Sequence, residues 1–356
     1  MKKIHFLLIG LLPLQLWGLT YLKNHPAWVE TYYSQRLYPF IFETHRFFFQ
    51  QFSFSLGDLF YAIAILLIVK SGVLFFKKRM VAWKLILGNS LSLISLVVLF
   101  FNVSWGLNYY RTPLHQDLKY KMTYNETELE NTLSKLILIS NQLHSQLSIN
   151  DTTAVKIQYS KDKIAELIEK EFDFDLKKMK PQPYLKQSLW STLLSYMGYS
   201  GYLNPFTLES QANSKIPKLN FIVTAAHEMA HQLGIASEGE ANFIAFYTSI
   251  KHSDPFVQYA GYTFALQYSY SELFKANPEL AKEKIKSLHP GIIKNYRAFS
   301  EFWKQYQNPF EPLLKKGYDS YLKANGQAQG IQSYSALVGY VIAYTQNDSF
   351  NLNLID

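Results

Sequence analysis

The sequence of 356 residues contains no cysteine. This absence excludes disulfide bonds, zinc sites built from cysteine and thiol nucleophiles. It fits an oxidising compartment, such as the outside of a cell or a periplasm. Internal repeats and low-complexity tracts are absent as well. A catalytic centre in this protein therefore does not depend on a thiol.

Two function classes lack the features that they would need. The net charge of +8 suggests a negatively charged partner. However, the lysines are spread along the chain, and no dense basic stripe is interleaved with aromatic residues, so we expect no nucleic-acid partner. The segment Gly198-Tyr199-Ser200-Gly201 lacks the second glycine of a nucleophile elbow, which argues against a serine hydrolase.

Charged residues are scarce in the first hundred positions, where three apolar runs occur at about Ile4–Leu22, Leu59–Phe76 and Leu85–Val103. Each has roughly 18 residues or more, the length a helix needs to cross a bilayer. The first run resembles a signal peptide, but no small-residue cleavage site follows it, so we interpret it as an uncleaved anchor. The sequence predicts a three-helix membrane anchor over residues 1–104, with the lipid bilayer as its partner, and a separate domain over residues 105–356.

The charges next to these runs predict their orientation. The short loop from Lys77 to Lys84 carries four basic residues and no acidic one, and Lys2-Lys3 precedes the first run. Basic loops stay in the cytoplasm, so the domain after Val103 is expected on the periplasmic or outer side of the cytoplasmic (inner) membrane. Aromatic residues gather where the outer interface is expected, namely Phe47, Phe48, Phe49, Phe52, Phe54, Trp105, Tyr109 and Tyr110.

The remainder of the chain is polar enough to fold in water. Residues 108–113 are expected to leave the membrane as an extended linker. Apolar spacing predicts helices over residues 126–148, 161–172, 220–233 and 238–251, and further helices up to Tyr344. Residues 198–206 are rich in turn-forming and aromatic residues and predict a short strand. The expected fold class is mainly α, with a mostly helical α+β domain that contains a small sheet.

His227-Glu228-Met229-Ala230-His231 is the most informative segment of the sequence. On a helix, His227 and His231 lie on one face, one turn apart, and two imidazoles at that separation can bind one zinc ion. Glu228 would stand beside the metal, where it can take a proton from the attacking water and pass it to a leaving amine. Two buried histidines in an ordinary helix are the alternative interpretation.

A catalytic zinc site needs a third protein ligand. Gly234 can end the helix in a left-handed conformation and allow the chain to turn back. Ser237 and Glu240 are then expected to form a capping box, which leaves Glu238 as the expected third ligand. Asn242 lies four residues after Glu238 and could accept a hydrogen bond from a ligand imidazole. Glu240 as the ligand, or neither glutamate, stays open.

These residues carry a family resemblance. His227-Glu228-x-x-His231 followed by Glu238-x-x-Ala241-Asn242 resembles the gluzincin arrangement, and the segment Glu-x-Glu-Ala-Asn is similar to that of repressor-cleaving and membrane-embedded metallopeptidases. Only six residues separate His231 from Glu238, which is shorter than usual for gluzincins. Gly234 resembles the turn of metzincins, whose third ligand is usually histidine. The resemblance implies a zincin-like domain, with zinc as its cofactor.

Over nearly its full length the chain resembles an uncharacterised family of bacterial membrane proteins with zinc-peptidase-like domains. The match is carried by the three apolar runs, by Trp105-Gly106-Leu107-Asn108-Tyr109-Tyr110-Arg111, and by Asn204-Pro205-Phe206-Thr207 ahead of the histidine motif. It implies zinc and a peptidase-like fold, and it supplies no substrate.

Further candidates lie outside the metal motif. Zincins hold substrates in extended form along a sheet edge, and residues 202–207 are a candidate for that edge, with a packing loop as the alternative. Tyr334 is the candidate stabiliser of a tetrahedral oxyanion, with a core or capping tyrosine as the alternative. Four other histidines have no partner at ligand spacing and are not expected to bind metal: His115, His144, His252 and His289.

The sequence therefore predicts a membrane-anchored zinc metallopeptidase of the cell envelope that hydrolyses peptides or proteins. A non-catalytic zinc-bearing sensor or binding module is the main alternative. The presence of Glu228 argues against it, because a pure binding site does not need a base. A structural membrane protein with core histidines is the third interpretation.

Overall fold

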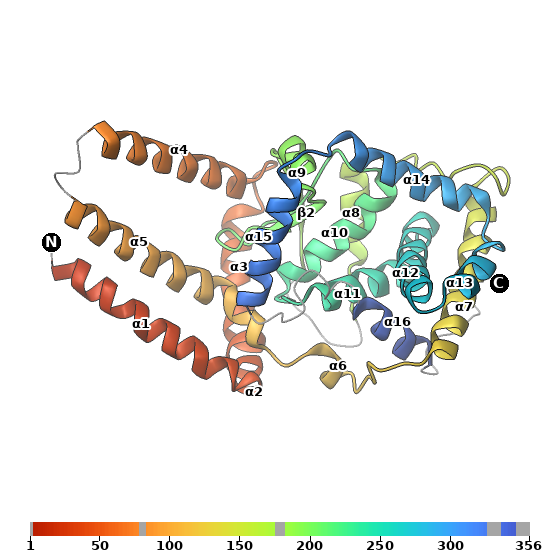
Figure 1. The fold of residues 1–356 in the computed structure, drawn as a ribbon, viewed down its shortest axis with the longest axis horizontal. Helices are drawn as coiled ribbons and strands as arrows, with labels where there is room; N and C mark the ends of the chain where they lie inside the picture. Colours follow the sequence, from red (N-terminus) through yellow and green to blue (C-terminus); the bar gives the residue numbers. More distant parts are fainter. Residues whose placement is uncertain (1–2, 78–82, 175–181, 326–335, 347–356) are drawn as a thin grey trace. The chain divides into compact units, whose positions relative to one another are not determined.

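The computed structural model describes residues 3–77, 83–174, 182–325 and 336–346 (Figure 1). The chain divides into two compact units. Unit 1 contains Met1–Thr112 and Leu203–Glu209, and unit 2 contains Pro113–Tyr202 and Ser210–Asp356. A short loop from the middle of the sequence is thus part of the N-terminal unit.

Three long helices of unit 1 are long and apolar enough to cross a membrane. They are α1 (Lys3–Lys23), α4 (Leu56–Lys77) and α5 (Trp83–Ser104). Their apolar stretches agree with the three expected runs to within three residues, which indicates a membrane protein. The basic residues Lys78 and Arg79 lie outside the described residues.

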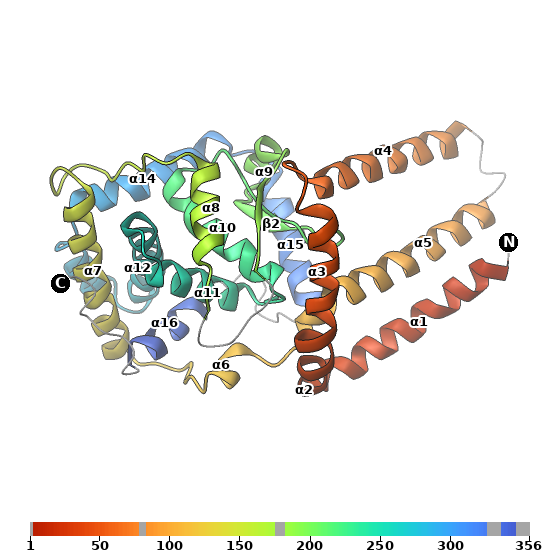
Figure 2. The same cartoon turned by 180° about the vertical axis from the view of Figure 1, so that it is seen from behind.

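Helices α1 and α5 run side by side (Figures 1 and 2). Polar side chains connect them: Gln15 Nε2 donates to Ser95 Oγ at 3.0 Å, and His5 Nδ1 lies 3.2 Å from Ser92 Oγ. Helices in a bilayer gain no hydrophobic energy from associating, so such hydrogen bonds contribute to their pairing.

The segment between α1 and α4 is largely helical. It contains α2 (Pro26–Trp28), the π-helix η1 (Val29–Leu37) and α3 (Tyr38–Phe49). The buried positions Val29, Tyr33, Tyr38 and Phe42 are separated by four, five and four residues. The wider turn of a π-helix absorbs the extra residue and keeps all four side chains on one face.

The expected interfacial aromatic belt is only partly exposed. Phe47 and Phe48 are exposed on α3, but Trp105 is buried. Residues Gly106–Tyr110 form the 3₁₀ helix η2, so the extended linker predicted from residue 108 was wrong at its start. Extended backbone begins at Arg111, where the helix ends.

Arg111 pairs with Glu30 of η1 inside unit 1. Its Nε lies 2.9 Å from Glu30 Oε2, and its Nη2 lies 2.8 Å from Glu30 Oε1. Only 8% of the Arg111 side chain and 7% of the Glu30 side chain are exposed. This bidentate ion pair connects the start of η1 to the segment that follows α5.

The loop Leu203–Glu209 explains the conspicuous segment Asn204-Pro205-Phe206-Thr207. Asn204 Oδ1 accepts hydrogen bonds from the backbone N–H groups of Phe206 and Thr207, which closes a turn. The Phe206 ring stacks on Phe100. The Glu209 carboxylate accepts from the backbone N–H groups of residues 56 and 57, which satisfies donors at the start of α4. Most of the segment expected to form a substrate-binding edge is therefore a packing turn of unit 1.

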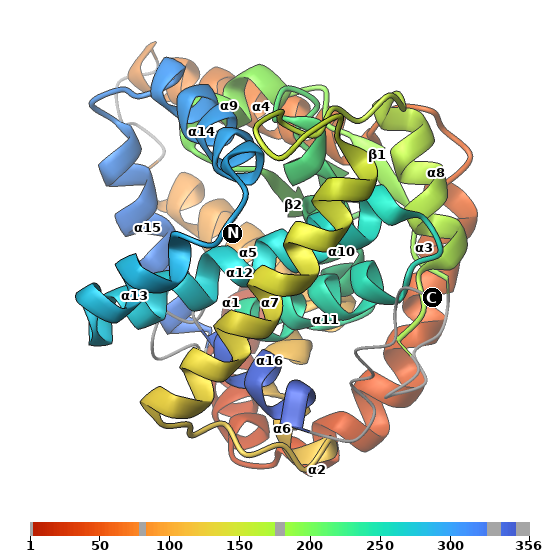
Figure 3. The ribbon, with the colours of Figure 1, turned by 90° about the vertical axis from the view of Figure 1, so that its right-hand side faces the viewer.

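Unit 2 is built mainly from helices, and Figure 3 shows α7 crossing in front of α12, against which it packs. The four helices predicted here are confirmed to within two residues as α7, α8, α10 and α11. The described helices are α6 (Leu114–Asp117), α7 (Glu126–Leu147), α8 (Lys161–Glu171), α9 (Ser191–Met197), α10 (Lys218–Gln232), α11 (Glu238–Lys251), α12 (Pro255–Ala276), α13 (Pro278–Ile285), α14 (Pro290–Gln305), α15 (Glu311–Ala324) and α16 (Ala336–Gln346).

A small sheet accompanies these helices, as the sequence predicted. Its strands are β1 (Leu185–Gln187), β2 (Gly201–Leu203) and β3 (Ser210–Ala212), in the order β1-β3-β2. β1 and β3 are parallel, with Lys186 opposite Gln211. The central strand β3 is buried and packs against α10, which contains His227, Glu228 and His231.

The buried pair of Glu30 and Arg111 yields a stability prediction. Glu30→Gln leaves the guanidinium buried without its counter-charge, which costs about 3–5 kcal/mol. We expect a clearly lower thermal unfolding midpoint in detergent micelles. Replacing both residues by methionine removes both charges and should restore most of the loss. A double variant no more stable than Glu30→Gln would contradict this account of the pair.

Candidate metal centre

Helix α10 forms because its apolar residues recur on the faces that pack in unit 2. Phe221, Ile222, Ala225 and Met229 are fully buried along it. The two motif histidines project from the same helix one turn apart, and their ring centroids are separated by 4.5 Å. Both imidazoles are almost completely buried, with 11% and 9% of their side chains exposed.

A tight turn ends α10 and returns the chain towards the histidines. Gly234 adopts a left-handed conformation with φ of 82°, as the sequence predicted. The N–H of Gly234 donates to the carbonyl of His231, and the N–H of Ile235 donates to the carbonyl of Ala230. Both bonds satisfy carbonyl groups at the helix end. The next helix, α11, then begins at Glu238.

Glu238 lies between the two histidines. Its Oε2 is 3.2 Å from His227 Nε2 and 3.5 Å from His231 Nε2. Its other oxygen, Oε1, accepts a hydrogen bond of 2.6 Å from the Tyr318 hydroxyl. The buried Oε2 has no partner with hydrogen-bond geometry among the described residues. The carboxylate is thus anchored through one oxygen and directs the other towards both imidazoles.

The remaining ring nitrogens determine where the imidazole lone pairs point. His227 Nδ1 lies 2.8 Å from Asn242 Oδ1, and His231 Nδ1 lies 2.6 Å from the carbonyl oxygen of Ile235. Both oxygens are acceptors, so each Nδ1 carries the proton and donates it. In the neutral rings, each Nε2 then directs a lone pair towards Glu238.

These three residues can hold a metal ion, because one donor atom of each lies within 4.8 Å of the other two. Donors at 2.0–2.1 Å from a tetrahedral ion are separated by roughly 3.3 Å. The separations of 3.2 and 3.5 Å between Glu238 Oε2 and the two Nε2 atoms agree with that value. The donor set is two nitrogens and one carboxylate oxygen.

Glu238 and His231 favour each other's charged forms. Burial favours the neutral form of Glu238, but the two histidines outweigh it and hold its pKa well below the usual range. Burial also works against a charged His231, but Glu238 outweighs it and raises the pKa of His231 to about 9. Without a metal, the cluster therefore holds a proton at neutral pH, and a metal ion would displace that proton.

Glu228 lies beside the cluster and is buried. Burial raises its pKa to about 7, while His227 and His231 act in the opposite direction. Its Oε2 has no hydrogen-bond partner among the described residues. Strand β2 passes directly against this side chain, since a Cβ at Gly201 would lie 2.7 Å from Glu228 Oε1. Gly201 therefore provides the space that Glu228 occupies.

Glu240 does not belong to the cluster, and its predicted capping role was wrong. Ser237 is the N-cap residue of α11 but makes no capping hydrogen bond through its side chain. Glu240 Oε1 instead accepts from the Leu114 backbone N–H at 2.8 Å and from the Tyr340 hydroxyl at 3.2 Å. Because Glu240 is buried, its carboxylate satisfies donors of α6 and α16 rather than its own helix start.

The structure brings together five of the residues that the sequence singled out: His227, Glu228, His231, Glu238 and Asn242. Tyr334, the candidate oxyanion stabiliser, lies outside the described residues. A tyrosine that the sequence did not single out, Tyr318 of α15, donates a hydrogen bond to Glu238 and packs edge-on against Tyr199. No local pattern could have identified Tyr318, because it lies 80 residues from Glu238.

Comparison with known proteins finds one family. No curated protein matches the chain, and no solved structure matches it. A family model described as "protein of unknown function (DUF3810)" matches residues 33–342, a range that covers most of the chain and the whole candidate metal centre. The match confirms the expected resemblance to an uncharacterised family. The chain therefore belongs to the DUF3810 family, whose function is unknown.

Proposed function

We propose that this protein is a membrane-anchored zinc-dependent peptidase. Its metal ligands are His227, His231 and Glu238, and Glu228 is its general base. The observation that carries the proposal is the approach of Glu238 Oε2 to both Nε2 atoms at tetrahedral donor spacing, beside the buried Glu228, whose Oε2 has no hydrogen-bond partner among the described residues. Three protein ligands are the number that catalytic zinc sites use, because a further position must take water or substrate.

The donor chemistry favours zinc. Two imidazoles and one carboxylate form a set that catalytic zinc sites employ, and the chain has no thiolate to offer. The hydrogen bonds from the Nδ1 atoms to Asn242 and Ile235 fix the ring orientation, as is common for zinc-bound histidines of other proteins. When bound, zinc would polarise a scissile carbonyl and lower the pKa of a water molecule.

Glu228 supplies the proton transfer in this proposal. A carboxylate is an efficient base when its pKa is close to the working pH, and burial brings the pKa of Glu228 to about 7. Its Oε2 can take a proton from the attacking water and give it to the leaving amine. Tyr318 acts as a positioning residue, since its hydroxyl holds Glu238 Oε1.

The substrate class follows from the strand beside the base. β2 is an edge strand of the described sheet, and its Gly201 abuts Glu228. An extended peptide that adds to the edge strand of a sheet presents its backbone at regular spacing and is held mainly through main-chain hydrogen bonds. We propose that peptides or proteins of the cell envelope bind in this way, with a scissile bond next to Glu228.

A non-catalytic binding module would account for the metal ligands but not for Glu228. A buried carboxylate without a hydrogen-bond partner is costly, and metal binding does not require it.

The side of the membrane follows from the basic residues between the second and third apolar runs, which stay in the cytoplasm by the positive-inside rule. We therefore propose that the metal centre works outside the cytoplasm.

The ligand assignment predicts a graded loss of zinc. Protein dialysed against a mild chelator should retain about one zinc ion per chain, and His227→Ala and His231→Ala should lose it. Glu238→Gln should weaken binding strongly, whereas Asn242→Ala should weaken it roughly 10–100-fold. Elemental analysis measures the number of zinc ions per chain in each variant.

Glu240→Gln is the matched control, because it changes a buried carboxylate of the same helix that is not part of the group formed by His227, His231 and Glu238. It should leave the zinc content unchanged. Loss of zinc in Glu240→Gln but not in Glu238→Gln would show that the wrong glutamate was assigned.

The base assignment predicts a loss of turnover without a loss of metal. Glu228→Gln keeps the size of the side chain and all three ligands, but the amide cannot accept the proton. We expect hydrolysis to fall by roughly 10²–10⁴-fold. Comparative peptidomics of the envelope from cells with wild-type, Glu228→Gln or Glu240→Gln protein identifies the products. Identical peptide profiles in all three would leave the binding module as the better interpretation.

The proposed orientation predicts the activity of topology reporters. A reporter fused after Asp356 should be active only on the outer side of the cytoplasmic membrane, and one fused at Arg79 only in the cytoplasm. Paired reporters with opposite compartment requirements make each fusion its own control. Cytoplasmic activity of the fusion after Asp356 would reverse the orientation and exclude envelope substrates.

A further inference from the structure

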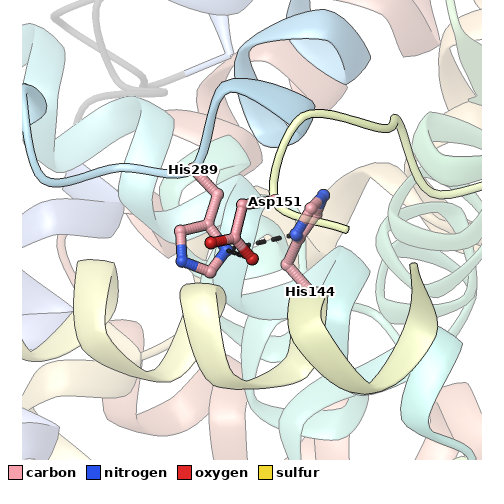
Figure 4. Close-up of side chains that lie close together, drawn as sticks. All are labelled: His144, Asp151 and His289. Carbon is pink, nitrogen blue, oxygen red and sulfur yellow. Dashed lines mark hydrogen bonds and ion pairs between the residues drawn. The ribbon is translucent and has the colours of Figure 1, made fainter. Parts of the chain in front are cut away.

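A second group of potential ligands lies in unit 2, formed by His144, Asp151 and His289 (Figure 4). His144 projects from the last turns of α7, Asp151 lies in the turn that follows, and His289 immediately precedes α14. His289 Nδ1 is 3.2 Å from His144 Nδ1 and 3.5 Å from Asp151 Oδ1. These separations match the roughly 3.3 Å expected between donors around one tetrahedral ion.

The buried imidazole of His144 is oriented as a ligand. Its Nε2 lies 2.9 Å from the carbonyl oxygen of Thr153, so this nitrogen carries the proton and donates it. The lone pair of Nδ1 then faces His289 and Asp151 (Figure 4). A backbone carbonyl that fixes the far nitrogen of a histidine is the arrangement found around metal-bound imidazoles.

The three segments are held together by contacts that leave the proposed ligand atoms free. Asn141 Oδ1 accepts from the backbone N–H of His289, and Asn141 Nδ2 donates to the carbonyl of Ser287. The backbone N–H of Gly291 donates to the carbonyl of Asp151. A Cβ at Gly291 would lie 2.2 Å from His144 Nε2, so the start of α14 rests directly on the imidazole.

Direct contacts among the three side chains explain this geometry less completely than a shared metal ion does. One hydrogen bond can join the two Nδ1 atoms, but the separation of 3.5 Å from His289 Nδ1 to Asp151 Oδ1 exceeds the usual 2.7–3.2 Å. The start of α14 carries a partial positive charge of about half a unit, which opposes a cation there. The full negative charge of Asp151 outweighs it.

We propose that His144, Asp151 and His289 form a second binding site for a zinc-like divalent transition-metal ion. Among the described residues no glutamate belongs to this ligand group, and 63% of the Asp151 side chain is exposed. Its ion therefore exchanges with solvent and joins the end of α7 to the start of α14, which is a structural role. The sequence did not indicate this site, because His144 and His289 are 145 residues apart.

Titration of the full chain with Co²⁺ in detergent micelles tests the site. Co²⁺ binds where zinc binds and absorbs visible light. We expect Co²⁺ to bind both to wild-type protein that keeps one zinc ion per chain after dialysis against a mild chelator and to His231→Ala, in which the first centre is disabled. His289→Ala should abolish this binding, and Asp151→Asn should weaken it by at least roughly tenfold. His289 makes no capping hydrogen bond through its side chain, so the alanine variant removes no helix cap.

His25→Ala is the matched control, since His25 is exposed and belongs to neither ligand group. It should bind Co²⁺ as the wild type does. Added Zn²⁺ should raise the thermal unfolding midpoint of His231→Ala but not that of His231→Ala combined with Asp151→Asn. Co²⁺ binding that is unchanged in His289→Ala and Asp151→Asn, or absent from both starting proteins, would refute the site. Because His231→Ala lacks the first centre, this result does not depend on the proposed peptidase function.

Discussion

The carboxylate of Glu238 lies in the interior of unit 2 between two imidazoles, and the surrounding structure compensates its buried charge. An ionised carboxylate that leaves water costs several kcal/mol unless it is paired and hydrogen-bonded. The imidazoles of His227 and His231 provide the pairing, and the hydroxyl of Tyr318 provides the hydrogen bond. Each of these groups is positioned by a different local feature, so the centre connects α10, the turn at Gly234, α11 and α15.

Neighbouring carboxylates illustrate that chemistry follows the partners of a residue and not its type. Glu238 and Glu240 are two residues apart on α11 and both are buried. Glu238 directs one oxygen towards the histidines, whereas Glu240 accepts from a backbone N–H and from a tyrosine hydroxyl. Glu228 is buried without such donors, and its pKa rises to about 7. One helical pair thus holds three buried carboxylates in three different environments.

Local patterns predicted much of this arrangement. The i, i+4 spacing of the histidines, the left-handed glycine and the short distance to α11 depend only on helix and turn geometry, so the sequence was sufficient. The apolar runs were predicted for the same reason, since their length and composition are local properties. The capping box failed because burial gave Glu240 distant partners that no local pattern reveals.

Long-range contacts account for the other differences. The π-helix of unit 1 accommodates an irregular spacing of buried residues, which the regular 3.6-residue helical period does not predict. The turn at Asn204 belongs to unit 1 although it is distant in sequence from α4 and α5. Tyr318 and the pair of His144 and His289 become recognisable only after the chain has folded, because their partners lie 80 and 145 residues away.

Anomalous X-ray diffraction at the zinc absorption edge, from crystals of the full chain grown with zinc, tests the central claim most directly. The account predicts a strong anomalous peak within roughly 2.0–2.2 Å of His227 Nε2, His231 Nε2 and Glu238 Oε2. A map in which these three side chains are ordered but no zinc lies between them would contradict it.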